Sequence, residues 1–143
     1  MNNDDRFKSF QNKYPNLFKE YPRSGFYLPN GWDHLVHNLC SLVEDHITRL
    51  PEEIREHVQC AQVKEKFGTL RFYMEQDTPY IRGVIELAEL MSYDICETCG
   101  KPGKIRKGGW VQVLCNKHYK EKQKLAKAII EGMAKKLAAE KKK

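Results

Sequence analysis

The feature that most constrains this chain is a set of three cysteines and one histidine in its second half. Cys96 and Cys99 form a C-x2-C pair, and Cys115 and His118 form a C-x2-H pair, with fifteen residues between the two pairs. Two such pairs give a zinc ion four soft or borderline ligands in a tetrahedron. Because protein atoms fill all four positions, no coordination site is left for water or a substrate. The pattern therefore predicts one structural Zn2+ ion and not a catalytic one.

The residues around these ligands predict how they are brought together. Gly100 follows the second cysteine and permits the positive φ that turns backbone N–H groups toward the sulfurs. Strands at 104–107 and 110–114, joined by a Gly-Gly turn, predict a hairpin, and the last two ligands then share the first turn of a helix. Knuckle, hairpin and helix in this order resemble a treble-clef zinc finger over residues 94–122. Many functions use this arrangement, so it supports a metal site and no particular activity.

The N-terminal part of the chain predicts an arm followed by a helix. Residues 1–30 are rich in aromatic side chains separated by prolines, which favours an ordered arm laid across a core, since a disordered tail would hold fewer aromatics. Asn30 is expected to cap the next helix. Apolar residues recur there at three- and four-residue spacing from Trp32 to Leu50, and Pro51 closes the helix.

The middle of the chain has the period of strands. Segments 58–66 and 69–75 are rich in β-branched and aromatic residues, and Phe67-Gly68 between them predicts a tight hairpin turn. Thr78 and Pro79 then mark the start of another helix, which ends within 92–95.

These elements predict an α+β fold: an N-terminal helix, β-hairpin and helix core, followed by the treble-clef-like zinc finger and a long C-terminal amphipathic helix. The expected divisions are an aromatic arm at 1–30, an α-β-β-α core at 31–94, the finger at 95–122 and a Lys-rich helix and tail at 123–143. The last helix has apolar residues spaced by four, which is typical of a packing or self-association seam: Leu125, Ile129, Met133 and Leu137.

Composition limits where the chain works. No apolar run approaches the roughly 18–20 residues that a membrane span needs, and the start MNNDDRFKSF is acidic and polar where a secretory signal is basic and then apolar. We therefore expect a cytoplasmic protein with no membrane association. Of the five cysteines, Cys40 and Cys60 lie in apolar stretches and are expected to be small buried hydrophobes.

Charge is divided unevenly along the chain, whose formal net charge is +6. Residues 1–95 carry 11 Lys and Arg against 15 Asp and Glu, a balance of −4, whereas residues 96–143 carry 14 against 4, a balance of +10. A local excess of this size predicts an acidic partner, either nucleic acid or an anionic protein surface. A solvated lysine-rich helix without a partner is the alternative explanation of the lysine run.

Three motifs carry a resemblance to a known family. They are GW-x2-LV at Gly31–Val36, VKEKFGTLRFY at Val63–Tyr73, and CETCGKPG followed by GGW-x3-LC-x2-H between Cys96 and His118. With them the chain resembles an uncharacterised family of small phage and prophage proteins over most of residues 26–118. The resemblance implies a bacterial host cytoplasm and a role in contacting host or phage components, and it implies no activity.

The leading hypothesis is a non-enzymatic, zinc-stabilised binding protein of phage type whose partner is nucleic acid. Lysine contacts to phosphates are electrostatic and largely neutral to sequence, and they weaken steeply with salt. The candidate contact residues form a basic face around the finger: Lys101, Lys104, Arg106, Lys107, Lys117, Lys120 and Lys124.

The alternative hypothesis is a protein-binding inhibitor or modulator of a host defence protein. Its contact surface would be the charged face of the hairpin, gripping an acidic host or phage protein, because arginine and aromatic residues are enriched at binding hot spots: Lys64, Lys66, Arg71 and Tyr73. Three other hairpin residues are expected to build the core, namely Phe67, Leu70 and Phe72. Trp110 is expected to cover the metal site.

An enzyme is the least favoured reading. Histidines at positions 34, 37, 46 and 57 lie near Glu44, Asp45 and Glu53, and such groups can do acid and base chemistry. The chain holds no H-E-x2-H, no G-x-S-x-G and no P-loop motif. We therefore predict no catalytic residues.

Overall fold

The computed structural model describes residues 1–142 and confirms the mixed α+β class, with two small hairpins and a long C-terminal helix. Lys143, the end of the predicted Lys-rich tail, lies outside the described residues. The elements are α1 (Asn3–Lys13), η1 (Asn30–Trp32), α2 (Asp33–Thr48), α3 (Glu52–Arg55), β1 (Cys60–Lys66), β2 (Thr69–Met74), α4 (Pro79–Ser92), β3 (Lys104–Arg106), β4 (Gln112–Leu114) and α5 (Asn116–Lys141).

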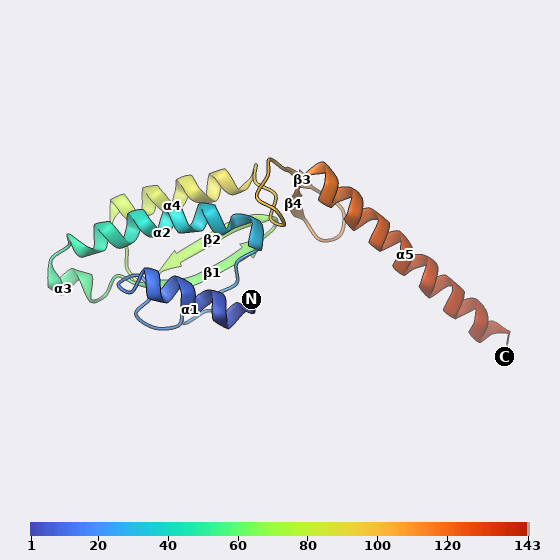
Figure 1. Ribbon diagram of the computed structural model, residues 1–143, viewed down its shortest axis with the longest axis horizontal. Helices are drawn as coiled ribbons and strands as arrows, with labels where there is room; N and C mark the ends of the chain where they lie inside the picture. The colour runs from blue at the N-terminus through green and yellow to red at the C-terminus, as the bar shows by residue number, and fades with distance from the viewer. Residues whose placement is uncertain (143) are drawn as a thin grey trace.

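The first seven elements form one body. Helices α2 and α4 run side by side above the β1–β2 hairpin, and α1 lies below it, whereas α5 projects away from the body (Figure 1). The main hydrophobic cluster lies between these layers, and all its buried members fall between Phe7 and Ala88. Elements β3, β4 and α5 add no residue to this cluster, so the body has a core of its own.

The hairpin has the predicted turn and one irregularity. Phe67 and Gly68 have φ of 53° and 82°, the left-handed values of a two-residue hairpin turn. The register shifts between Cys60 and Gln62. This bulge explains why the buried residues of β1, Cys60 and Val63, stand three apart instead of two.

The predicted aromatic arm is partly helical. Asn2 caps α1 by accepting a hydrogen bond from the Asp5 backbone N–H, and the rings of Phe7 and Phe10 are buried on one side of the helix. Further along, the arm extends the hairpin, because the Tyr27 N–H donates to the Val63 carbonyl at 2.9 Å. The arm therefore covers the edge of β1 that the hairpin leaves open.

The expectation that Asn30 caps the following helix is wrong. Residues Asn30–Trp32 form a 3-10 turn, so α2 begins only at Asp33 and no side chain caps it. Trp32 is fully buried, and its indole N–H donates to the Ile95 carbonyl at 3.0 Å. This turn therefore ties the start of α2 to the segment that leads into the metal ligands.

Candidate metal centre

The four predicted ligands come together at one point. Their ligand atoms all lie within 4.8 Å of one another. The Cys115 sulfur is 3.9 Å from the Cys99 sulfur and 3.2 Å from Nδ1 of His118, and the Cys96 sulfur is 3.7 Å from that same nitrogen. These four side chains could hold one metal ion, and all five cysteines of the chain are free of disulfides.

Local backbone structure sets this geometry. In the knuckle, the Gly100 N–H donates to the Cys96 carbonyl at 2.8 Å, and Gly100 itself has φ of 79°. At the other end of the site, Cys115 is the N-cap residue of α5 and His118 lies in the first turn of that helix. The predicted order of knuckle, hairpin and helix is thus present, although β3 and β4 are each only three residues long.

The environment favours the metal-binding forms of the ligands. Burial would raise the pKa of the Cys96 thiol, but backbone N–H groups of Cys115, Cys99 and Thr98 lower that pKa to about 6. His118 presents Nδ1 to the sulfurs, and its Nε2 lies 3.8 Å from the Glu121 carboxylate. A carboxylate behind a ligating imidazole orients the ring and fixes the nitrogen that faces the metal.

Two glycines seat the knuckle against the start of α2. The Gly31 N–H donates to the Glu97 carbonyl at 2.8 Å. A Cβ at Gly31 would lie 2.0 Å from the Cys96 carbonyl oxygen, and a Cβ at Gly100 would lie 2.8 Å from the Gly31 carbonyl oxygen. Such distances leave no room for any side chain at either position. The GW pair at 31–32 is therefore part of the surface against which the metal module packs.

A second contact joins the metal module to the hairpin turn. A Cβ at Gly68 would lie 3.3 Å from the backbone of Gln112 in β4. The Gln112 side chain in turn donates to Oε1 of Glu97 at 2.5 Å, while Oε2 of Glu97 is buried without a partner among the described residues. Burial raises the pKa of Glu97, although the hydrogen bond from Gln112 opposes this. The metal module thus contacts the body at two places, near the start of α2 and at the turn of the β1–β2 hairpin.

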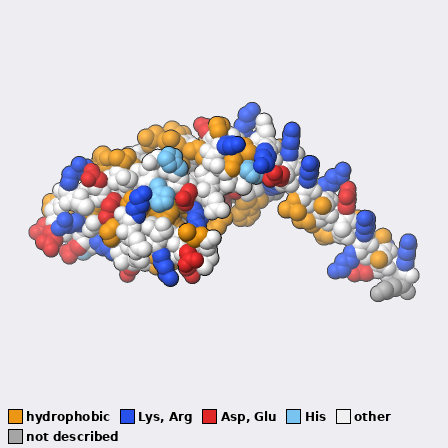
Figure 2. All heavy atoms as spheres, viewed as in Figure 1, with side chains coloured by type: hydrophobic (Ala, Val, Ile, Leu, Met, Phe, Trp, Pro, Cys, Tyr) orange, Lys and Arg blue, Asp and Glu red, His pale blue; other side chains and the backbone are white. Residues whose placement is uncertain are grey.

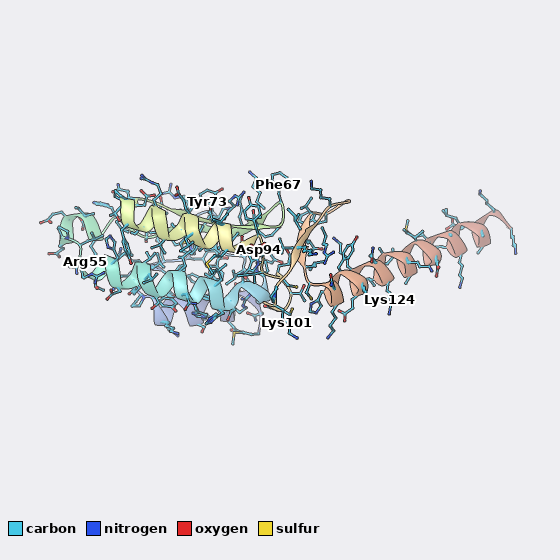
Figure 3. All side chains as sticks on the ribbon, turned by 90° about the horizontal axis from the view of Figure 1, so that it is seen from above. Arg55, Phe67, Tyr73, Asp94, Lys101 and Lys124 are labelled. Atoms are coloured by element: carbon cyan, nitrogen blue, oxygen red, sulfur yellow. The ribbon has the colours of Figure 1, made fainter. Side chains whose placement is uncertain are left out.

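Most of the predicted basic face is exposed. Six of its seven residues are exposed lysines on the knuckle, the second hairpin and α5. Lys101 lies on the opposite side of the metal module from Phe67, and Lys124 lies out on α5 (Figure 3). Arg106 is engaged within the protein, because it donates to the Leu114 carbonyl at 3.2 Å and its guanidinium lies 4.3 Å from the ring centre of Tyr119. Arg106 therefore joins β3 to α5.

The first hairpin brings three of its four candidate contact residues together, namely Lys64, Arg71 and Tyr73. Lys64 stands directly opposite Arg71 in the strand register, and its ammonium lies 5.9 Å from the ring centre of Tyr73, which is 42% exposed. Among the described residues, no carboxylate pairs with Lys64, Lys66 or Arg71. This face therefore carries an unbalanced positive charge. The opposition of Lys64 and Arg71 also costs stability, because like charges directly opposite each other destabilise a strand pair.

Two aromatic residues are not where the sequence placed them. Leu70 and Phe72 are buried as expected, but Phe67 is 70% exposed and does not belong to the core. Trp110 is 69% exposed and does not cover the metal site. Both residues sit at the tips of hairpins, where the chain turns away from the core. A ring in the turn position itself was the available sequence signal, since turn positions point into solvent.

Two of the histidines make contacts between elements of the body. His37 stacks on Phe10 with ring centres 4.1 Å apart, and it accepts or donates a hydrogen bond with the Tyr14 hydroxyl at 2.9 Å. His46 instead bonds the Thr78 hydroxyl at the start of α4, at 2.9 Å. A hollow of about 580 Å³ beside the metal knuckle is lined by His34 and Cys99 among others. Each of these two half-buried imidazoles, His37 and His46, thus holds elements of the body together.

Comparison of this chain with models of known protein families, with curated proteins and with solved structures finds no match. No helix in the described part of the chain combines the length and the apolar character that a membrane span requires.

Proposed function

We propose that this chain is a zinc-stabilised, non-enzymatic protein that binds nucleic acid through the exposed lysines of its metal module and α5. The observation that carries the proposal is the projecting helix α5, in which lysines gather along one edge (Figure 2). Its 26 residues span about 39 Å. A rigid basic rod of this length, fixed to the body by a metal site, suits contact with several successive phosphates.

The choice of zinc rests on the ligand types and their spacing. With bonds of about 2.3 Å to sulfur and about 2.0 Å to nitrogen, a tetrahedral zinc places its ligand atoms roughly 3.5–3.8 Å apart. The observed separations of 3.2, 3.7 and 3.9 Å fall around this range. Magnesium and calcium prefer oxygen ligands, so three sulfurs and one imidazole favour zinc. The four protein ligands leave the ion a structural role.

Five lysines of α5 lie on a different side of the helix from its apolar residues 125, 129, 133 and 137, whereas Lys122 and Lys136 fall among those apolar residues. At 100° per residue, Lys117, Lys120, Lys124, Lys127 and Lys135 fall within roughly a quarter of the circumference. Among them, only Lys127 has an ion-pair partner in the described residues, Glu131 at 4.0 Å. The lysine edge is therefore free to meet an external anion.

We expect the affinity for nucleic acid to fall steeply with salt, and this dependence tests the proposal. Each phosphate contact that is removed lowers the slope of log K against log salt by about 0.9 on a duplex and about 0.7 on a single strand. The double substitution Lys120→Gln, Lys124→Gln should therefore reduce the slope by roughly 1.4–1.8. The measurement is fluorescence anisotropy of labelled random-sequence DNA and RNA over a series of salt concentrations.

The matched control is Lys8→Gln, Lys13→Gln, which removes the same charge from the exposed side of α1. It should leave the slope nearly unchanged, because α1 lies in the half of the chain with a negative balance. Equal slopes for the two double variants, or no binding by the wild type even at low salt, would contradict the proposal.

The apolar edge of α5 favours a second proposal, that two copies pair through this helix. Four residues of that edge are 53–63% exposed, namely Leu125, Ile129, Met133 and Leu137. An antiparallel pair about Glu131 places Leu125 opposite Leu137 and Ile129 opposite Met133 of the second copy. The same register sets Glu121 against Lys141 of the second copy. The lysine edge stays outside such a pair, so pairing and nucleic-acid binding are compatible.

The pairing predicts a molecular mass that rises with protein concentration toward twice the chain mass of 16.8 kDa. Ile129→Glu with Met133→Glu should hold the protein as a monomer, because two carboxylates would then enter the apolar seam. Ala128→Glu adds a carboxylate on the lysine side of the helix, about 100° from Ile129, and should leave the pairing intact. Sedimentation equilibrium distinguishes these outcomes, and a wild type that is monomeric at all concentrations would refute the pairing.

A further inference from the structure

Phe67 occupies a position that neither turn geometry nor packing explains. It is the first residue of a two-residue hairpin turn and has φ of 53°. Asn, Asp and Gly are favoured there because other L-residues are strained by roughly 1–2 kcal/mol in this left-handed region. Its ring gains no burial in return, since the residue is 70% exposed. Strain that brings no stability is found chiefly at functional sites.

Trp110 makes a similar case at the tip of the second hairpin. It follows Gly108 and Gly109, both of which have positive φ, and it is 69% exposed. Tryptophan is highly buried on average, because its ring carries a large apolar area. Two hairpin tips of this chain thus each present an aromatic ring to solvent.

Both rings line one hollow, the Phe67–Trp110 cleft, of about 370 Å³. Its lining residues are Glu65, Lys66, Phe67, Gly109, Trp110 and Val111. Among the described residues, these two rings form no aromatic pair with each other. The hairpin turn is held against β4 by the close approach of Gly68 to Gln112. This contact between the two hairpins fixes the position of one tip relative to the other.

Lysines stand beside each ring. The Lys66 ammonium lies 5.6 Å from the ring centre of Phe67, and the Lys122 ammonium of α5 donates to the Trp110 carbonyl at 2.9 Å. Glu65, the one acidic residue of the lining, accepts a hydrogen bond from the Gly68 N–H at 2.6 Å and so serves the turn. Flat rings for stacking beside cations for phosphates are the two parts of a site for single-stranded nucleic acid.

We infer that the Phe67–Trp110 cleft takes an unpaired base of a single-stranded nucleic acid, with Lys66 and Lys122 meeting the neighbouring phosphates. The inference rests on the proposed function and deepens it, because it makes the preferred ligand a single strand. A base in a duplex is stacked and paired and cannot enter such a cleft without first leaving its helix. The lysine edge of α5 alone would bind both forms.

The test uses Phe67→Asn and Trp110→Ala in the full-length, metal-loaded protein. Stacking of one base on an aromatic ring contributes about 1–3 kcal/mol, so each variant should bind a labelled oligothymidine roughly 5- to 150-fold more weakly than the wild type. Affinity for a duplex should stay unchanged. Phe67→Asn should also leave the thermal stability equal or higher, because asparagine tolerates this turn position, and this separates a lost contact from a lost fold.

Tyr27→Ala is the matched control, because Tyr27 is an exposed ring, at 59%, that does not line the cleft. Its affinity for the single strand should equal that of the wild type. If oligothymidine binds with the expected salt dependence but the two cleft variants bind it as tightly as the wild type, the cleft inference fails and the proposed function stands. If no oligonucleotide binds even at low salt, both fail, and the exposed rings are then a site for a protein partner.

Discussion

Replacing Cys96 or Cys115 by serine is expected to remove the bound metal and to unfold residues 95–122, while the body stays folded. Among the described residues, the metal module buries only three hydrophobic side chains, Cys96, Val113 and Leu114. So small a core does not hold a fold without a metal or disulfides. A structural zinc contributes an apparent free energy of about 10–16 kcal/mol in finger peptides. Loss of one ligand therefore leaves the module without its main source of stability.

The body should survive this change because its hydrophobic cluster lies wholly within residues 7–88. Native mass spectrometry should find one zinc per wild-type chain and none in either serine variant. Backbone amide NMR signals should collapse toward unfolded positions for the module and stay dispersed for the body. Cys40→Ala is the matched control: it removes a buried cysteine from the body, so it should keep the metal. An apo protein with unchanged thermal stability would refute the prediction.

Gly31→Ala should be among the most damaging single substitutions in the chain. The added methyl group would lie 2.0 Å from the Cys96 carbonyl oxygen, 2.6 Å from the Glu97 carbonyl carbon and 2.7 Å from the Gly100 nitrogen. All three are backbone atoms of the knuckle, so no side-chain rotation relieves the overlap. We expect the knuckle to separate from α2 and the free energy of unfolding to fall by more than about 4 kcal/mol. Metal affinity should fall with it.

Two other glycines provide the comparison. Gly83 in α4 and Gly132 in α5 have no atom within 4 Å of the place where a Cβ would stand. Alanine at these helical positions should raise the stability by up to about 1 kcal/mol, since glycine is a poor helix former. Chemical denaturation of the three Gly→Ala variants gives the free energies of unfolding. If the free energy of unfolding of Gly31→Ala were as high as that of the other two variants, the predicted close contact between Gly31 and the knuckle would be contradicted.

The parts of this structure that sequence could predict are those with a local signal. The four ligands were predictable because a tetrahedral ion needs two close pairs, and C-x2-C and C-x2-H supply them. The first hairpin turn was predictable because Phe67-Gly68 interrupts two runs of β-forming residues. The apolar period likewise predicted α2 and α4, although the 3-10 turn at 30–32 moved the start of α2.

The remaining features depend on contacts between distant parts of the chain. An aromatic residue next to a strand favours a core position, and only the place of Phe67 in the turn itself signals that its ring faces solvent. The prediction that Trp110 covers the metal site is wrong for the same reason, since large apolar rings are highly buried on average. The role of Arg106 is also non-local, because its partner Asn116 belongs to the helix that follows the second hairpin.

The contact between Gly31 and Gly100 has a consequence for how such a chain can be inherited or recombined. A finger that follows a loose linker can be exchanged between proteins as a cassette. Here the exchanged segment would begin at residue 95, yet the surface that it packs on is the Gly31-Trp32 pair in the 3-10 turn before α2. A graft onto a helix without that pair would meet a side chain where the knuckle needs bare backbone. The Gly31-Trp32 segment and the metal module must therefore change together. A recombination crossover between them would join a metal module to a body on which it does not fit.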